Sequence, residues 1–322
     1  MATLDRPTLI RCIEAATLAP SLHNSQPWRF RVDGDSVDVY GDPGRRLEVL
    51  DPNGRELIIS VGAALFTLRA AIRDAGWIPT VETFPDPDLT DLVARVRLGR
   101  PAEPSRESQE LAGAIARRHT NRQPFSSAVV SADVLDKLRD AAEHEGARLT
   151  VAGGARRTVI VSLGRAAADR LHRRGGYFAE LNRWTRQLPG RVDGIPAHAM
   201  GPWDALERIP MRDFGTVNPQ PSRHGEEFEA YPTIAVLTTV GDTRVQWLQA
   251  GQALQRILLV ATRLHLATTP ISQPVEIPSI RDVLSDPRTG RWAQMVIRLG
   301  YGPPAGATPR RPVTEVLLAP GA

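Results

Sequence analysis

The sequence predicts an α+β protein built from two related halves that meet near residue 100. Two long apolar segments, at residues 55–76 and 247–266, have the periodicity of buried helices. Each is followed by a loop and a strand that ends in Arg-Leu-Gly, at residues 97–99 and 298–300. Few identities connect the halves, so the shared order of helix, loop, strand and tripeptide is what indicates an internal duplication.

The composition is that of an ordinary globular protein. The 322 residues are 42% hydrophobic and 24% charged, which is enough to bury a core in one large or two modest domains. Lys137 is the only lysine, so the formal charge of +4 reflects arginines, which are spread along the chain. We read this bias mainly as composition, with a weaker indication of phosphate binding.

The cysteine content and the early apolar run limit the class of protein further. The single cysteine, Cys12, excludes an internal disulfide and a cysteine-based metal cluster. Arg11 and Glu14 interrupt the only early apolar run, so no signal peptide is expected, and no stretch approaches the length of a membrane span. We expect a cytoplasmic protein that binds neither membranes nor nucleic acid.

The first half, residues 1–100, is expected to open with a helix that has Asp5 as its cap and Pro7 in its first turn. Alternating residues around Asp33-Gly34 predict a hairpin. The elements expected after the first helix are strands at 28–32 and 36–40, a helix at 55–76 and a strand at 93–98 that ends at Gly99. The polar, proline-bearing residues 100–104 mark the expected boundary between the halves.

The second half, residues 101–322, continues with helices and strands in mixed order. The expected helices are 105–118, 131–143, 158–172 and 247–266, and the expected strands are 148–151, 233–239 and 294–299. Residues 175–231 lack periodicity, and a stretch of that length is usually a lid or a binding loop. Its Trp184, Trp203 and Phe214 argue against disorder. We expect a lid over a ligand site; the alternative is a surface insertion that packs on its own half.

The segment from Ala19 to Phe30 is the densest in polar chemistry. Pro20 and Pro27 prevent a helix through it and remove two backbone donors. The side chains that can bond to backbone or to the polar edge of a planar ligand are those of Ser21, Asn24, Ser25 and Gln26. The alternative is a loop that is capped by its own side chains.

A second segment, residues 117–125, suits a phosphate group. Arg118, Thr120 and Arg122 alternate beyond the end of a helix, and alternating residues of an extended segment share a face. Two forked guanidinium groups and one hydroxyl on a common face can hold a phosphate. The alternative is a solvated arginine cluster in an arginine-rich protein.

Both segments resemble motifs of the FMN-dependent nitroreductase family. Residues 20–28 are similar to its Pro-Ser-x-x-Asn-x-Gln-Pro-Trp loop, which lies against the flavin ring and comes from the opposite subunit of an obligate dimer. Residues 118–125 resemble its Arg-x-Ser-x-Lys/Arg-x-Phe phosphate motif, with the aromatic displaced by one position. The resemblance implies the nitroreductase fold and an FMN site. Its expected contacts in these segments are Ser21, Leu22, His23, Asn24, Arg118, Thr120 and Arg122.

Two further pieces follow from the resemblance. Residues 270–273 occupy the place of the family's Pro-Ile-Glu-Gly beside the flavin N5 edge, which adds Ile271, Ser272 and Gln273 to the expected contacts. A side chain at Gln273 in place of glycine puts ordinary turnover in question. Arg310 or Arg311 resembles the C-terminal basic residue that completes the phosphate site, and the register favours Arg311.

The distribution of the motifs implies one flavin site per chain. The first half has the ring-facing loop but no phosphate motif before it, and the second half has the phosphate motif but no such loop after it. The chain is most similar to the actinobacterial Acg-like group, in which one chain mimics the dimer, so we expect a monomer.

The resemblance implies that FMN carries a hydride from NADH or NADPH to a nitro or quinone acceptor. That chemistry belongs to the flavin and requires no side-chain acid or base, so no catalytic residue is named. The seven histidines have no metal-ligand spacing, and no metal is expected. The alternative function is a non-catalytic protein that sequesters FMN beneath the lid.

Overall fold

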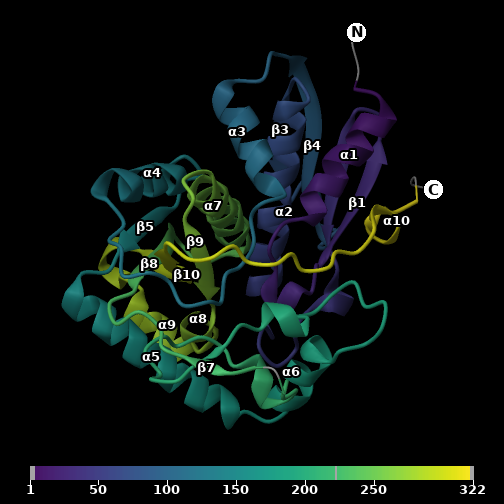
Figure 1. Ribbon diagram of the computed structural model, residues 1–322. Helices are drawn as coiled ribbons and strands as arrows, with labels where there is room; N and C mark the ends of the chain where they lie inside the picture. The colour runs from purple at the N-terminus through teal and green to yellow at the C-terminus, as the bar shows by residue number, and fades with distance from the viewer. Residues whose placement is uncertain (1–3, 222, 320–322) are drawn as a thin grey trace.

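The computed structural model describes residues 4–221 and 223–319 and contains two four-stranded antiparallel sheets with the same strand order (Figure 1). The strands of the first sheet are β1 (Trp28–Asp33), β2 (Ser36–Gly41), β4 (Leu92–Pro101) and β3 (Trp77–Thr83), in that spatial order. Those of the second are β5 (Arg148–Val151), β8 (Thr233–Val240), β10 (Arg291–Gly300) and β9 (Ala267–Ile271). In each sheet the fourth strand along the chain lies between the second and the third. This shared topology supports the duplication, which remains an inference.

The helices surround the two sheets, and two long ones form the centre of the molecule. Their bounds are α1 (Arg6–Thr17), α2 (Arg55–Asp74), α3 (Arg106–Ile115), α4 (Ala132–Glu143), α5 (Gly154–His172), α6 (Tyr177–Thr185), α7 (Arg244–Arg263), α8 (Gln273–Glu276), α9 (Pro278–Leu284) and α10 (Val313–Val316). Helix α1 begins as predicted, because the Asp5 carboxylate accepts a hydrogen bond of 3.0 Å from the Thr8 N–H. In both sheets a 20-residue helix, α2 or α7, follows the second strand.

Helices α2 and α7 pack directly against each other and join the halves (Figure 1). Gly62 and Gly251 make this close approach possible, and both belong to the short stretch of α2 and α7 that aligns without gaps. A Cβ at Gly62 would lie 2.3 Å from the Leu248 carbonyl oxygen, and one at Gly251 would lie 2.0 Å from that of Ile59. A buried hydrogen bond of 2.9 Å from Gln255 Nε2 to Thr67 Oγ1 also joins the two helices.

Several predicted boundaries were wrong. Strand β4 does not end at Gly99 but continues to Pro101, because the missing side chain lets β3 approach: a Cβ at Gly99 would lie 2.5 Å from the Ile78 carbonyl oxygen. Strands β3 and β9 were not predicted. Helix α5 begins at Gly154 rather than at residue 158, and α3 ends at Ile115 rather than at 118.

The segment at residues 175–231, which we call the lid after its expected role, is described except for Ser222 and is not structureless. It contains α6, which the absence of periodicity over the whole stretch concealed, and a pair of two-residue strands, β6 (Trp203–Asp204) and β7 (Gly225–Glu226). In the first sheet the corresponding connection, from β1 to β2, is a tight hairpin turn at residues 34–35. The lid buries an apolar cluster against the first half, formed by Leu47, Leu50, Leu171, Tyr177, Leu181, Trp184, Ile195, Met200 and Phe214.

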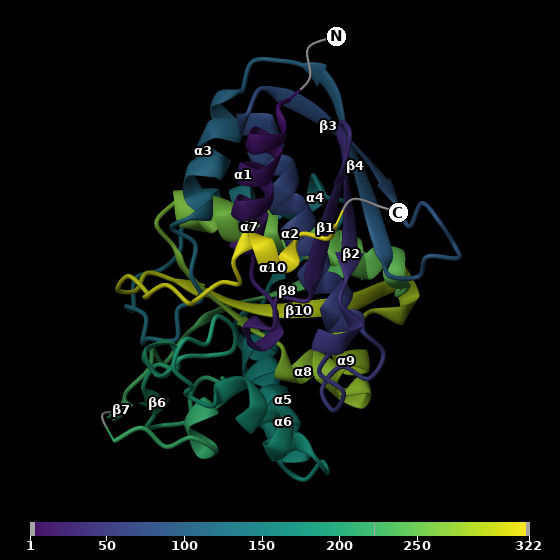
Figure 2. The ribbon, with the colours of Figure 1, turned by 90° about the vertical axis from the view of Figure 1, so that its right-hand side faces the viewer.

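The C-terminal segment crosses from the second half to the first (Figures 1 and 2). After β10 it runs along the molecule to β1, where the Leu318 N–H donates a 2.7 Å hydrogen bond to the Phe30 carbonyl oxygen. Helix α10 packs near α1 on this side. The crossing brings Arg310 and Arg311 close to the loop that follows α1.

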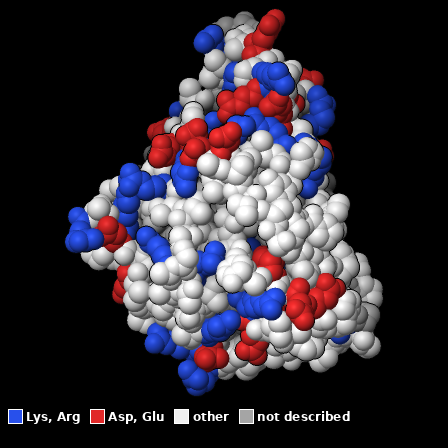
Figure 3. All heavy atoms as spheres, turned by 60° about the vertical axis from the view of Figure 1, so that its left-hand side comes forward, with Lys and Arg blue, Asp and Glu red and all other residues white. Residues whose placement is uncertain are grey.

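The surface carries both signs of charge. On the face in Figure 3, arginine and acidic side chains alternate around a broad uncharged area, with no extended patch of one sign. None of the helices in residues 4–221 and 223–319 has the length and apolar character needed to cross a membrane. The same residues contain no group of three or more histidine, cysteine or acidic side chains that could hold a metal ion.

Candidate functional site

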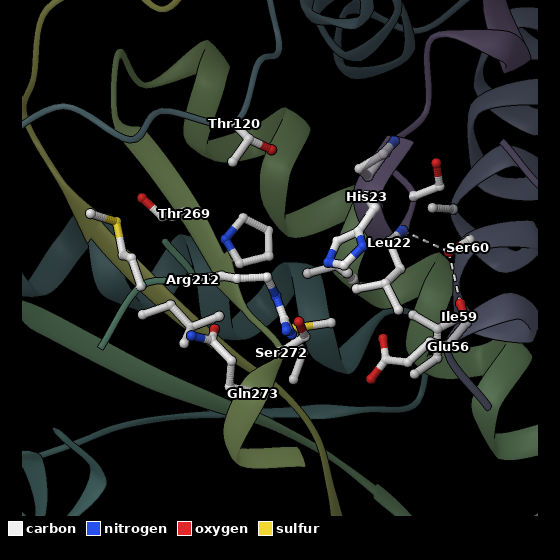
Figure 4. A pocket seen from close by; sticks show the side chains of 18 of the residues that line it. Leu22, His23, Glu56, Ile59, Ser60, Thr120, Arg212, Thr269, Ser272 and Gln273 are labelled. Atoms are coloured by element: carbon white, nitrogen blue, oxygen red, sulfur yellow. Dashed lines mark hydrogen bonds between the residues drawn. The ribbon is translucent and has the colours of Figure 1, made fainter. Parts of the chain in front are cut away.

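A cavity lies between the halves, and both halves line it (Figure 4). In Figure 4, Leu22, His23, Glu56, Ile59 and Ser60 form one side, while Thr120, Thr269 and Gln273 face them from the other. The predicted site residues that line this cavity are Ser21, Leu22, His23, Thr120, Arg122, Ile271, Ser272 and Gln273. The side chains of Asn24, Arg118 and Arg311 lie outside the lining.

The loop that follows α1 has a strained backbone. His23, Asn24 and Gln26 have positive φ angles of 51°, 54° and 51°, which side-chain-bearing residues seldom adopt. The surrounding chain holds this shape: Asn24 Nδ2 donates to the Gly194 and Pro309 carbonyls, both at 3.0 Å, and Gln26 Nε2 donates to Val192 at 2.8 Å. The amides are therefore bound to the lid and the C-terminal segment, while Leu22 and His23 point into the cavity.

His23 is a buried polar side chain whose ring nitrogens have no hydrogen-bond partner among the described residues. It is 4% exposed, and neither ring nitrogen forms a hydrogen bond with any described residue. Burial, with the charges of Arg212 and Arg122, holds the pKa of His23 well below its usual range, so the imidazole is neutral. A buried unsatisfied polar group costs about 1–3 kcal/mol. One N–H donor and one nitrogen acceptor are thus available to a ligand in the cavity.

The segment after α3 runs beside β9 as an extended chain, as the phosphate prediction required. The Asn121 N–H donates a 2.9 Å hydrogen bond to Thr268, and Thr120 and Arg122 both face the cavity. Arg122 Nη1 donates to the Ala199 carbonyl at 2.8 Å, and the guanidinium lies 5.0 Å from the centre of the Phe214 ring. Burial and the charge of Arg212 lower the pKa of Arg122 to about 10.

Arg118 pairs with Arg310 at the end of α1. Arg118, 3% exposed, donates from Nη2 to the Leu18 carbonyl at 3.1 Å, and Arg310 Nη2 donates to the same oxygen at 3.3 Å. Burial and the charge of Arg310 lower the pKa of Arg118 to about 9, and burial lowers that of Arg310 to about 10. Each Nε atom lacks a hydrogen-bond partner among the described residues. A buried and a partly buried cation, neither with an ion-pair partner among the described residues, suit an anion.

Arg311 lies in a different environment. Its backbone N–H donates to Gln26 Oε1 at 2.8 Å, and its Nη2 donates to the Glu315 carbonyl at 2.9 Å. The residue that the structure brings beside Arg118 is therefore Arg310, the option that the register disfavoured. The predicted trio is also divided, since Thr120 and Arg122 line the cavity and Arg118 does not.

Several lining residues escaped the sequence analysis. Helix α2 contributes Glu56, Ile59 and Ser60, and the lid contributes Met211 and Arg212. A lone acidic residue beside an apolar helical stripe was the only signal for Glu56. Arg212 had no sequence signal, because the residue with which it pairs, Glu276, is 64 residues away.

The lid side chains meet the cavity through Arg212 and Phe214. Arg212 Nη2 lies 2.6 Å from both carboxylate oxygens of Glu276, its Nη1 lies 3.0 Å from the Tyr177 hydroxyl, and the Arg212 and Glu276 side chains are buried. Phe214 meets the His23 ring edge-on, with the ring centres 5.3 Å apart. Of the three aromatics noted in the lid sequence, Phe214 lines the cavity, Trp184 packs in the cluster with Leu47, and Trp203 is exposed.

Comparison with known proteins identifies the class. A family model described as "Nitroreductase family" matches residues 115–301. A Mycobacterium tuberculosis H37Rv protein named "Putative NAD(P)H nitroreductase Rv3131" is 33% identical over 98% of this chain and 92% of its own length. The chain therefore belongs to the nitroreductase family, and the resemblance drawn from its motifs is confirmed.

Other relatives place the chain more narrowly. "Putative NAD(P)H nitroreductase acg" of the same organism is 32% identical over 98% of this chain and 96% of its own length, as the motif distribution led us to expect. Among solved structures, an FMN-bound nitroreductase from Desulfitobacterium hafniense is 16% identical, covers 65% of this chain and 97% of its own, and has a TM-score of 0.40. An FMN-bound nitroreductase from Bacteroides fragilis is 14% identical, covers 63% and 94%, and has a TM-score of 0.37.

Proposed function

We propose that this protein is an FMN-dependent oxidoreductase that binds one FMN between its two halves. The observation that carries the proposal is the cavity itself, where the loop at residues 20–28 meets Thr120, Arg122 and residues 270–273. These stretches were singled out from the sequence separately, and they come from different halves. The names of the relatives support NADH or NADPH as the electron donor, and nitro compounds or quinones are the proposed acceptors.

The residues present fit FMN. The guanidinium groups of Arg118, which is buried, and Arg310, which is partly buried, each have an unpartnered Nε and would hold the phosphate together with Thr120. The neutral ring of His23 and the side chain of Leu22 would contact the isoalloxazine ring. When bound, FMN supplies hydride transfer, which no side chain can perform.

The protein's own contribution is positioning and exclusion of water. Ser272 and Gln273 lie at the end of β9, and the described structure gives neither side chain a hydrogen bond, so both are free to meet a ligand. Phe214 and Met211 line the cavity from the lid side. A dry, closed site strengthens the electrostatic interactions within it.

The test is anaerobic mixing of FMN-loaded protein with NADH or NADPH. We expect the absorbance of oxidised flavin to disappear, and we expect denaturation to release one FMN per chain, because one set of motifs is complete. Light scattering of the same sample should give a monomer. Protein that retains no FMN, or that reproducibly retains two per chain, contradicts the proposal.

Sequestration of FMN is the second candidate, and the lid favours it. Met211, Arg212 and Phe214 all line the cavity, and the buried pair with Glu276 holds this part of the lid in place. Under sequestration, NADPH bleaches the bound FMN slowly and Phe214→Ala accelerates the bleaching. Under catalysis, NADPH bleaches the FMN of the unmodified protein quickly, and the same substitution changes the rate little. Trp203→Ala, at an exposed lid position, is the matched control.

A further inference from the structure

Glu56 is the acid in the cavity wall. It lies in the first turn of α2 and is 3% exposed, yet its carboxyl lines the cavity near Ser60 and Ser272 (Figure 4). Arg55 Nη2 donates to Glu56 Oε1, and Oε2 has no hydrogen-bond partner among the described residues. One carboxyl oxygen is thus left for whatever enters the cavity.

Arg55 is the ion-pair partner of this carboxyl, and its other hydrogen bonds fix its position. Its Nη1 donates to the carbonyl and the side-chain oxygen of Gln294, at 2.9 and 3.1 Å, and its Nη2 also donates to the Val275 carbonyl at 3.2 Å. The guanidinium is therefore held between α2, α8 and β10. Glu56 receives one of its several hydrogen bonds.

The charged groups around Glu56 come from three helices and the loop before α2, and they act in opposite directions. Arg55 on α2 and Arg281 on α9 favour its ionised form, while Asp51 before α2 and Glu276 on α8 oppose it. Burial is the largest influence, and the pKa of Glu56 rises to about 7. Both protonation states are consequently populated near neutral pH.

Among the described residues, no other side chain that lines the cavity changes its protonation state near neutral pH. His23 is neutral there because its pKa is held low, and Arg122 and Arg212 keep their charge. Residues 269–273, which form the opposite wall, bring no titratable side chain. Glu56 is therefore the lining side chain able to give up a proton near neutral pH.

We propose that Glu56 is a catalytic residue that delivers the proton accompanying hydride transfer to the acceptor, a role that rests on the proposed FMN function. A quinone that becomes a hydroquinone gains one hydride, which originates from the reduced nicotinamide, and one proton. The Glu56 O–H bond breaks as an O–H bond forms on the quinone oxygen. The carboxylate left behind takes a proton from water when the product leaves.

The experiment compares Glu56→Gln with Glu180→Gln in FMN-loaded protein. Glu180 is a matched control, because burial also raises its pKa, but its carboxylate accepts hydrogen bonds from the Val49 and Leu50 N–H groups outside the cavity. The first measurement is the infrared absorbance of protonated carboxyl groups in the FMN-loaded protein from pH 5.5 to 8.5. We expect an inflection near pH 7 in the unmodified protein and in Glu180→Gln, and none in Glu56→Gln.

The second measurement is kcat with a quinone acceptor. Positioned general acids contribute on the order of 10²–10⁴-fold, so kcat of Glu56→Gln should fall about 10²-fold or more at pH 6, with little change in Glu180→Gln. Glu56→Asp keeps an acid on a shorter side chain and should move the inflection in pH, even if Glu56→Gln loses FMN.

Each outcome separates the two claims. FMN-loaded Glu56→Gln with an unchanged inflection and unchanged kcat overturns the role of Glu56 and leaves the FMN site standing. An unshifted inflection in Glu56→Asp overturns it as well. Failure of the unmodified protein to bind FMN overturns the proposed function, and the proton-donor role of Glu56 falls with it.

Discussion

The buried pair between Arg212 and Glu276 offers the sharpest test of how the lid is held. Arg212→Met should leave the Glu276 carboxylate buried without its partner and remove the hydrogen bond to the Tyr177 hydroxyl. Breaking a buried ion pair by deleting one member costs about 3–5 kcal/mol, because the remaining charge is not compensated. We expect the free energy of unfolding to fall by that amount.

The double variant, Arg212→Met with Glu276→Met, should recover most of this loss. Replacement of both charges by apolar groups of similar length removes the pair and the desolvation penalty together, and such changes are often neutral or stabilising. The coupling energy in the double-mutant cycle should therefore be large, in contrast to that of the half-exposed Arg97–Glu82 pair, whose side chains are 52% and 49% exposed. Exposed pairs contribute about 0.2–1 kcal/mol.

The assay is equilibrium unfolding in urea, followed by tryptophan fluorescence, for the two single variants, the double variant and the Arg97–Glu82 controls. A loss below about 1 kcal/mol in Arg212→Met would mean that water reaches Glu276 and that the lid is not held by a buried charge pair. The reasoning would also be refuted if the double variant lost as much free energy of unfolding as the two single variants together. The loss would then come from packing and not from an uncompensated charge.

Three other outcomes are expected. Arg118→Ala combined with Arg310→Ala should weaken FMN binding far more than riboflavin binding, since hydrogen bonds to charged groups contribute about 1.5–3 kcal/mol each. Equal losses of affinity in a titration with both ligands would mean that these arginines do not bind the phosphate. The raised pKa of Glu56 means that the folded state binds more protons than the unfolded state between pH 4.5 and about 7, so the free energy of unfolding should fall by up to about 3 kcal/mol as pH rises through that interval. Glu56→Gln should flatten this dependence in urea titrations at successive pH values, and an equal slope in both proteins would argue against it. Gly251→Ala places a Cβ 2.0 Å from the Ile59 carbonyl oxygen and should lower the melting temperature strongly through about 1–3 kcal/mol or more of overpacking, whereas Gly113→Ala, an exposed helical position with nothing within 4 Å, should not.

Much of the framework could be predicted because local signals agreed with the tertiary structure. Asp5 followed by Pro7 is a helix start on local grounds alone. Asp33-Gly34 indicates a hairpin for the same reason, although the turn itself lies one residue further on, at residues 34–35. Strand β9 was missed because residues 267–271 contain a proline and two threonines and read as a loop. The strand exists because it pairs along β10, a contact that the sequence does not display.

Within the site, the sequence identified the segments better than the individual side chains. Of the alternating Arg118, Thr120 and Arg122, Thr120 forms a β-bridge with Thr268, whereas Arg118 still bonds back to Ala114 at the end of α3. The Arg118 side chain turns toward the Leu18 carbonyl at the end of α1 and meets Arg310 there. Which of two adjacent arginines points inward depends on the path of the C-terminal segment across the halves. That path is determined by long-range contacts such as the one between Leu318 and Phe30.

If the lid opens to admit a ligand, the charges of its buried ion pair need not be left uncompensated. Substitution of Arg212 leaves the buried Glu276 carboxylate without its ion-pair partner. Opening of the lid would instead carry Arg212 into water and expose Glu276 at the same time, so each charge would regain its hydration. In such an opening the ion pair would contribute little to the cost, which would come mainly from uncovering apolar side chains such as Phe214. An enzyme whose substrates enter beneath the lid would have to open it in every catalytic cycle. A sequestering protein would have to open it only to take up or release FMN. The bleaching rate of Phe214→Ala relative to the unmodified protein consequently distinguishes catalysis from sequestration.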